Sequence, residues 1–199
     1  MALVEMDRPT RDSRGSDSAL RDWVRALEAT APIAGNPRRI LLDAIEELTQ
    51  VQGDAAALIS EHGTLTYRAL VERSRRYARW ALDQNLAKGQ TVCLMMPNRP
   101  EYMAAWLGIT AIGGVASLIN TQLRGPTLAH CLNIVAPSHA IVADECIEQF
   151  RSAELSGRPK VWSQGSGEYL PIDGEIERLS AAPPTETERR PTALADLSL

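Results

Sequence analysis

"LMMPNRPEYMAAWLG", residues 94–108, changes its hydrophobic pattern at a proline. The run from Thr91 to Met96 is almost wholly apolar, which is typical of a strand that is covered on both faces in a parallel sheet. Pro97 ends this run, and apolar residues then recur at helical spacing, at Met103, Ala104, Leu107 and Ala111. The stretch therefore predicts a buried strand that turns abruptly into a helix.

The turn carries start signals for that helix. Asn98 is a good N-cap residue and Glu101 stands three residues later, so the two side chains are expected to bond each other's backbone amides as a capping box. Pro100 suits the first helical turn, where its missing N–H costs nothing. Gly113 and Gly114 are expected to end the helix.

The same cycle recurs downstream. Residues 115–120 and 139–144 predict further buried strands, 126–135 and 146–155 predict helices, and 160–163 predicts a fourth strand. Alternation of strands and helices at this pitch indicates right-handed βαβ units. The predicted fold class is therefore α/β, with an open, mostly parallel sheet and helices on both faces.

Four more elements are predicted upstream. They are two amphipathic helices (around Leu20–Leu27 and Ile40–Leu48), a β-hairpin in "AALISEHGTLTY", and a long helix from a Thr66 cap to about Asn85. The long helix carries a row of arginines. This row suits either contact with anionic lipid or a solvated helix surface. We favour the solvated surface, because acids interrupt the row, at Glu72 and Asp83.

Charge divides the chain unevenly. Residues 1–163 hold 18 Lys and Arg against 18 Asp and Glu, whereas residues 164–199 hold 3 against 7. We expect a disordered arm over 1–17, the α/β subdomain over 18–163, and a poorly ordered acidic tail over 164–199.

Composition excludes several classes of function. No basic stripe suggests a nucleic-acid partner. The three cysteines stand singly and there are only three histidines, which gives a metal site little to draw on. No apolar run is long enough to span a bilayer, and the first residues do not resemble a signal peptide. These features predict a cytoplasmic protein.

Catalytic motifs are also missing. The sequence contains no Gly-x-Ser-x-Gly and no Gly-x-Gly-x-x-Gly, so we assign no catalytic residue. Ser156–Lys160 contains Gly-x-Pro-Lys, a string that also ends the phosphate loop of a large enzyme superfamily. Here it lacks the preceding Ser/Thr and Gly run and comes before a strand, so we interpret it as a turn.

Three stretches together resemble the N-terminal part of the adenylate-forming, or AMP-binding, enzymes: "TLTYRALVERSRRYARWAL", "KGQTVCLMMPNRPEYMAAWLGITAIGGVASLINTQLRG" and "LAHCLNIVAPSHAIVAD". More narrowly, they are similar to bacterial relatives of the fatty-acid transport proteins, which are long- and very-long-chain acyl-CoA synthetases. The most specific strings are Asn-Thr-x-Leu-Arg-Gly and Leu-Ala-His-Cys-Leu-Asn. The resemblance is strong over 64–144 and weaker over 18–160.

The resemblance implies an activity for the full-length family. Its members activate a fatty acid with Mg-ATP and then pass the acyl group to coenzyme A. That mechanism needs a phosphate loop, an acid on the ribose and a mobile C-terminal domain with a catalytic lysine, and this sequence shows none of them. The chain ends where the family would enter the strand before its phosphate loop. We therefore expect no cofactor in this chain alone.

Two functions stay open. The first is an N-terminal fragment of a fatty acyl-CoA synthetase, inactive alone, whose partners are fatty acid, coenzyme A and the missing remainder of the enzyme. The alternative is a non-catalytic α/β binding or assembly module derived from that fold. An α/β module unrelated to ligases is a more distant third.

Candidate binding residues follow the strands. In parallel sheets ligands gather beyond the carboxyl ends, where loops and helix N-termini converge. Two such loops carry Asn98, Arg99, Asn120 and Arg124. By the resemblance they would lie near the acyl or coenzyme A channel. Arg124 is the best candidate for a ligand contact, because a guanidinium suits a phosphate. The alternatives are that Arg124 pairs with an acid, Asn98 caps its helix and Asn120 holds a turn.

Overall fold

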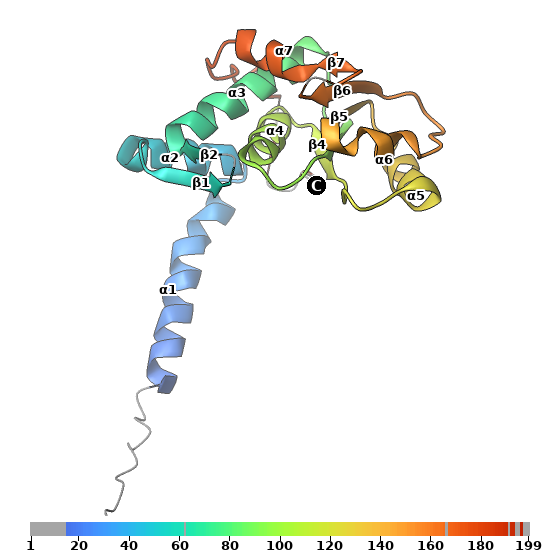
Figure 1. Ribbon diagram of the computed structural model, residues 1–199. Coiled ribbons are helices and arrows are strands. Elements are labelled where there is room, and N and C mark those ends of the chain that lie inside the picture. The colour runs from blue at the N-terminus through green and yellow to red at the C-terminus, as the bar shows by residue number, and fades with distance from the viewer. Residues whose placement is uncertain (1–14, 62, 166, 191, 194–195, 197–199) are drawn as a thin grey trace, which may run out of the picture. The chain divides into compact units, whose positions relative to one another are not determined.

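The computed structural model describes residues 15–61, 63–165, 167–190, 192–193 and 196 (Figure 1). The chain divides into two units, residues 1–37 and 38–199. Most of the predicted disordered arm lies outside the described residues. The first unit contains helix α1 (Gly15–Gly35), which confirms the first predicted helix. Its apolar side chains are exposed, at Leu20, Trp23, Val24 and Leu27.

The second unit is built on a five-stranded parallel sheet. In spatial order its strands are β4 (Val115–Leu118), β3 (Thr91–Met95), β5 (His139–Ala143), β6 (Lys160–Gln164) and β7 (Leu170–Pro171). The four predicted strands are all present. All five residues of β5 and the last four of β3 are buried, as expected for strands covered on both faces.

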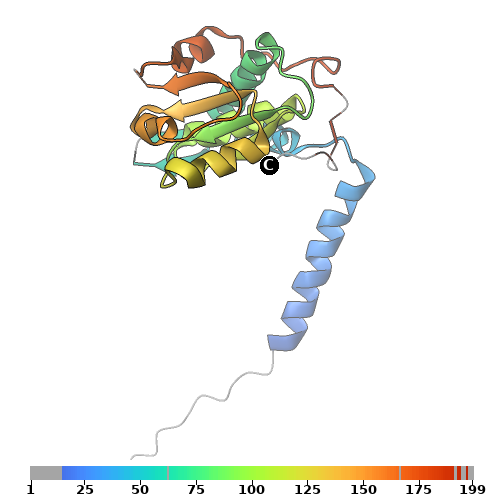
Figure 2. The ribbon, with the colours of Figure 1, turned by 90° about the vertical axis from the view of Figure 1, so that its right-hand side faces the viewer.

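Helices cover both faces of this sheet. The strands β4 and β5 lie on opposite sides of β3, so right-handed crossovers place the connecting helices on opposite faces. Figure 2 shows α5 (Gly125–Val135) and α6 (Ile147–Arg151) in front of the sheet, with α3 (Tyr67–Asp83) and α4 (Pro100–Ala111) behind it. The predicted α/β class is confirmed.

Residues 38–66 complete the second unit. They form α2 (Leu41–Gln52) and an antiparallel hairpin of β1 (Ala56–Ser60) and β2 (Gly63–Thr66), which confirms the predicted hairpin. The predicted cap of α3 is also present, because the Thr66 hydroxyl accepts a hydrogen bond from the Ala69 amide at 3.2 Å.

The predicted capping box at α4 is wrong. The N-cap residue is Arg99, and its side chain makes no capping hydrogen bond. The Glu101 carboxylate turns instead toward α3, where it accepts hydrogen bonds from Arg73 Nε at 2.6 Å and the Tyr77 hydroxyl at 2.8 Å. A charge-assisted bond to a largely buried guanidinium is stronger than a bond to an exposed backbone amide, so Glu101 does not cap.

The arginine row of α3 is not a solvated surface. Arg73 and Arg76 both pair with Glu177, and Arg79 pairs with Glu188 at 2.6 Å. The remaining members of the row pair with acids closer in sequence, Arg75 with Glu46 and Arg68 with Asp54. Glu177 and Glu188 both belong to the segment that was predicted to be a poorly ordered tail.

That segment is ordered in part, contrary to the prediction for 164–199. It adds β7 to the sheet and forms helix α7 (Ile172–Arg178), which begins four residues before the short helix predicted around 176–181. Ile172 and Ile176, one helical turn apart, are fully buried. Two buried apolar side chains and the pairing of Glu177 hold α7 against α3, so the α/β subdomain extends beyond the predicted boundary at residue 163.

Helices α3 and α4 touch closely at one glycine. A Cβ at Gly108 would lie 2.6 Å from Tyr77 Cβ and closer still to the backbone oxygen of Ser74. The Ser74 oxygen is a backbone atom and the Tyr77 Cβ is bonded directly to the backbone, so neither atom can move unless α3 itself shifts. Gly108 therefore sets the distance between the two helices.

We expect Gly108→Ala to lower the free energy of unfolding by about 1–3 kcal/mol, the usual cost of overpacking a core. The matched control is Gly174→Ala in α7, where a Cβ would meet nothing within 4 Å. That change should be neutral or stabilising by up to ~1 kcal/mol, because alanine favours the helix. Urea unfolding of both variants measures the difference, and equal effects would contradict this packing.

Candidate functional site

The strand order identifies a place for ligands. From β3 the chain continues to β4, its neighbour on one side, whereas from β5 it continues to β6 in the opposite direction across the sheet. The strand order therefore reverses between β3 and β5, and this position is the topological switch point. In open parallel sheets, ligands bind in the crevice beyond the carboxyl ends of the strands at such a point. Here the crevice is flanked by residues 96–99 after β3 and 144–146 after β5.

Arg99 fills this crevice. Its guanidinium pairs with Glu145 and donates a hydrogen bond to the Gln164 side-chain oxygen at 3.4 Å. The bridge joins the loop after β3 to the segment after β5 and to the last residue of β6. Gln164 is buried, and four-fifths of the Arg99 side chain is covered. The switch point is thus occupied by the chain's own charges, and Arg99 is a positioning residue here.

The loop after β6 packs tightly beside Asp144. A Cβ at Gly167 would overlap the Asp144 carboxylate, and Gly165 has a φ of +114°, which favours glycine. The Gly165 amide donates a hydrogen bond to Asp173 at 2.7 Å. Because of these contacts, the loop closes over the ends of β5 and β6.

A cavity remains open at the ends of β3 and β4. Its volume is about 440 Å³, and it is lined by Met96, Pro97, Asn98, Tyr102, Leu118, Ile119, Asn120 and Thr121. The side chains of Asn98 and Asn120 are exposed in it, and burial raises the pKa of the Tyr102 hydroxyl. Amide and hydroxyl groups contribute more of the exposed lining than apolar side chains do, and such a lining suits a small ligand with several polar groups.

The four predicted site residues are therefore not one cluster. Asn98 and Asn120 line the cavity, Arg99 bridges the crevice, and Arg124 stands apart as the exposed N-cap of α5. The Asn120 side chain also accepts a hydrogen bond from the Gln122 amide at 2.9 Å, which holds the turn as one alternative predicted. No described residue pairs with the Arg124 guanidinium, contrary to the other alternative.

Sequence reasoning missed Tyr102, Glu145 and Gln164. Each is at the carboxyl edge of the sheet. Gln164 is the last residue of β6, and Glu145 follows β5. That position was the available signal.

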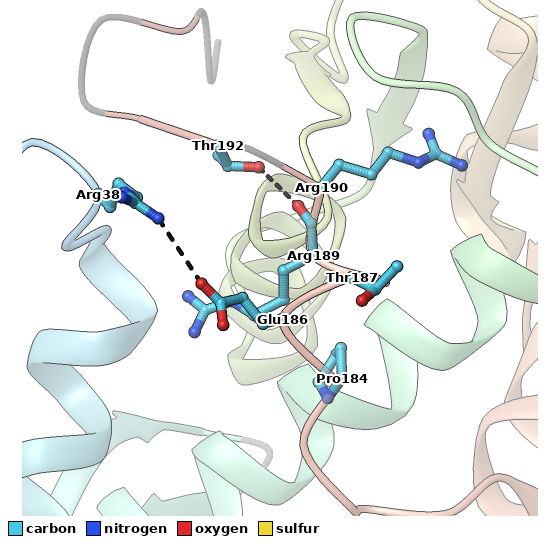
Figure 3. A pocket seen from close by; sticks show the side chains of 7 residues that line it. All are labelled: Arg38, Pro184, Glu186, Thr187, Arg189, Arg190 and Thr192. Atoms are coloured by element: carbon cyan, nitrogen blue, oxygen red, sulfur yellow. Dashed lines mark hydrogen bonds and ion pairs between the residues drawn. The ribbon is translucent and has the colours of Figure 1, made fainter.

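A second cavity of about 570 Å³ lies elsewhere, between α2 and the last described residues (Figure 3). Three of its residues are arginines, but they do not converge. Arg189 donates to Asp43 at 2.6 Å, Arg190 donates to the Leu86 carbonyl at 2.7 Å, and Arg38 faces Glu186 at 3.6 Å. Figure 3 shows Arg190 pointing away from Arg38. These side chains do not form an anion site.

The described residues offer neither a metal site nor a membrane-spanning helix. They contain no group of three or more His, Cys, Asp or Glu side chains placed to hold a metal ion. Within the same residues, no helix has the length and apolar character needed to cross a membrane.

The sequence model of the AMP-binding enzyme family matches residues 45–195. The chain belongs to this family. Among its relatives, long-chain fatty acid transport protein 6 of Mus musculus is 30% identical over 145 residues, covering 71% of this chain and 23% of the relative. A long-chain-fatty-acid–CoA ligase of Escherichia coli O6:H1 is 33% identical over 124 residues, covering 60% and 22%.

The fold is shared with solved structures of the family. The crystal structure of the N-terminal domain of FACL13 from Mycobacterium tuberculosis matches with a TM-score of 0.65 at 22% identity, covering 74% of this chain and 38% of that one. This likeness supports the fold. The chain spans about a fifth of the length of the two relatives named above.

The rim of the site depends on Glu101, which fixes the turn between β3 and α4. We expect Glu101→Gln to lower the free energy of unfolding by about 1.5–3 kcal/mol, because it weakens charged hydrogen bonds to the buried Arg73 and Tyr77. The control is Glu47→Gln, which removes an exposed pair with Arg39 and should change stability too little to resolve. Urea unfolding compares them, and a larger loss in the control would refute this role.

Proposed function

We propose that this chain supplies the N-terminal α/β subdomain of a fatty acyl-CoA synthetase. Such an enzyme activates a fatty acid with ATP and transfers the acyl group to coenzyme A. The observation that carries the proposal is the family match over 45–195 together with relatives named for long-chain fatty acids. The fatty-acid substrate and inactivity of the isolated chain are parts of the proposal.

The cavity at the ends of β3 and β4 supports a binding role within that enzyme. Its mostly polar lining suits the amide-containing pantetheine arm of coenzyme A, and Asn98 and Asn120 supply amide groups that can donate and accept hydrogen bonds. Arg124 is exposed and has no partner among the described residues, which leaves its guanidinium available to a phosphate.

The described residues do not fit ATP and its magnesium ion. The Gly-x-Pro-Lys string ends at Lys160, the first residue of β6, at the amino edge of the sheet and away from the cavity. Lys160 Nζ donates a hydrogen bond to Gln84 at 2.7 Å and lies 4.7 Å from the Trp162 ring centroid. A lysine held in this way contributes to packing. We therefore derive no step of adenylation from this chain.

One observation favours the alternative, a non-catalytic binding or assembly module. The crevice at the switch point is closed by Arg99 and Glu145 without any further chain. The gene sequence beyond codon 199 distinguishes the two proposals, since an in-frame phosphate loop would favour the synthetase.

The isolated chain should not exchange labelled pyrophosphate into ATP with any fatty acid. The donors that stabilise a transferring phosphate are absent from the described residues, and such preorganised charges supply much of the rate. Exchange above that of a boiled sample would refute inactivity and would return attention to Ser156–Lys160.

Arg124→Ala tests the ligand contact in a chimera that joins this segment to the remainder of a related active synthetase. We expect the KM for coenzyme A to rise about tenfold or more with unchanged thermal stability, since one charged contact is removed. The control is Arg158→Ala, an exposed arginine before β6. Lost stability with unchanged kinetics would make Arg124 structural.

A further inference from the structure

The last part of the chain is held to the α/β core in two different ways. The anchor, Leu170–Leu179, contains β7 and α7 and buries Ile172 and Ile176 completely. The strap comprises the described residues from Pro183 to Asp196. Among these, Pro184 is the only buried side chain, so apolar burial contributes much less to the strap than to the anchor.

Charges make the contacts of the strap. Arg79 of α3 donates to Glu188 at 2.6 Å and to the Pro183 carbonyl at 2.9 Å. Further contacts join Arg189 to Asp43, Arg190 to the Leu86 carbonyl, and Asp196 to Lys88 at 2.9 Å. Hydrogen bonds from the Thr185 amide and from Arg79 lower the pKa of Glu188, so this acid is charged in the folded state.

These pairs are accessible to solvent. The side chains of Arg79 and Glu188 are 22% and 36% exposed, and those of Lys88 and Asp196 are 37% and 31% exposed. Salt screens exposed charges strongly, whereas it leaves buried apolar contacts intact or strengthens them. The two attachments therefore respond differently to ionic strength.

The strap also lies over a poorly filled space. The cavity of about 570 Å³ in Figure 3 is lined by Arg38 and by strap residues, and Arg38 reaches across to Glu186 at 3.6 Å. A segment above such a space loses few packing contacts when it moves away.

Internal hydrogen bonds make the strap one cooperative element. Glu188 accepts from the Thr185 amide at 2.7 Å, while the Arg189 amide donates to the Thr185 carbonyl at 2.9 Å. The amides of Arg190 and Thr192 donate within the same turn. A turn this short does not persist alone in water, so its hydrogen bonds should open together when the strap leaves the core.

We propose that the strap is a charge-held latch that detaches from the α/β core as a unit while the anchor stays packed. The latch contacts Leu86 and Lys88, which precede β3, so it lies near the amino end of β3, whereas the cavity of the candidate site lies at the carboxyl end. It gives the described residues of the strap two positions on a core that does not change. This inference does not depend on the synthetase function.

Amide hydrogen exchange of the full chain tests the latch at 20 mM and 1 M NaCl. We expect the amides of Glu188, Arg189, Arg190 and Thr192 to exchange about tenfold faster at high salt, because several exposed ion pairs weaken together. The amide of Leu179 in the anchor and those of β5 should change less than twofold. Unchanged strap exchange would overturn the proposal, and so would strap and anchor amides that accelerate together.

Substitutions at Arg79 separate charge from shape. Arg79→Gln should accelerate strap exchange about tenfold at 20 mM salt and reduce its response to salt, whereas Arg79→Lys keeps the charge and should stay within threefold of the wild type. The matched control, Arg68→Gln, removes an exposed pair with Asp54 on the same helix and should leave the strap unchanged. Equal effects of Gln and Lys at position 79 would show that charge does not hold the strap.

Discussion

The charge cluster around Arg73 joins three helices that are distant in sequence. From α3, the guanidinium contacts Glu101 in the first turn of α4 and Glu177 in α7. Burial opposes the charge on Arg73, but the charge of Glu101 and the hydrogen bonds that Arg73 donates to Glu101 and Glu177 outweigh it and raise the pKa of Arg73. A guanidinium that is four-fifths covered must keep these partners, because losing one would leave a desolvated charge unpaired. The positions of α4 and α7 on α3 therefore depend on this cluster.

The same cluster shapes the candidate site. Since Glu101 is drawn toward Arg73 and Tyr77, it is not available to cap α4, and the chain enters the helix through Arg99. Asn98 is then exposed at the cavity, while the Arg99 side chain crosses to Glu145 and Gln164. The contact between Glu101 and Arg73 thus decides that Asn98 lines the cavity and that Arg99 closes the switch point.

The uneven charge of the chain has a structural explanation. The acids concentrated after residue 163 include the partners of Arg73, Arg76 and Arg79. Close to the sheet, these pairs are reinforced by the burial of Ile172 and Ile176, and the result is a fixed anchor. Farther along, Pro184 is the only buried side chain among the described residues of the strap, so the pairs there have little apolar support. The balance between burial and charge therefore changes along one continuous segment.

Local patterns were sufficient for strands β3 to β6, the hairpin and the Thr66 cap, because each depends on neighbours within a few residues. The carboxyl edge as the place of the site followed from the parallel topology, and Asn98 and Asn120 do line a cavity there. The role of Glu101, the pairing of Arg99 and the order of α7 could not be predicted in this way. Arg73 and Glu177 are 104 residues apart, and Arg99 and Glu145 are 46 apart. Only the packed structure brings such charges within reach and removes the water that would otherwise solvate them, and that desolvation selects their partners.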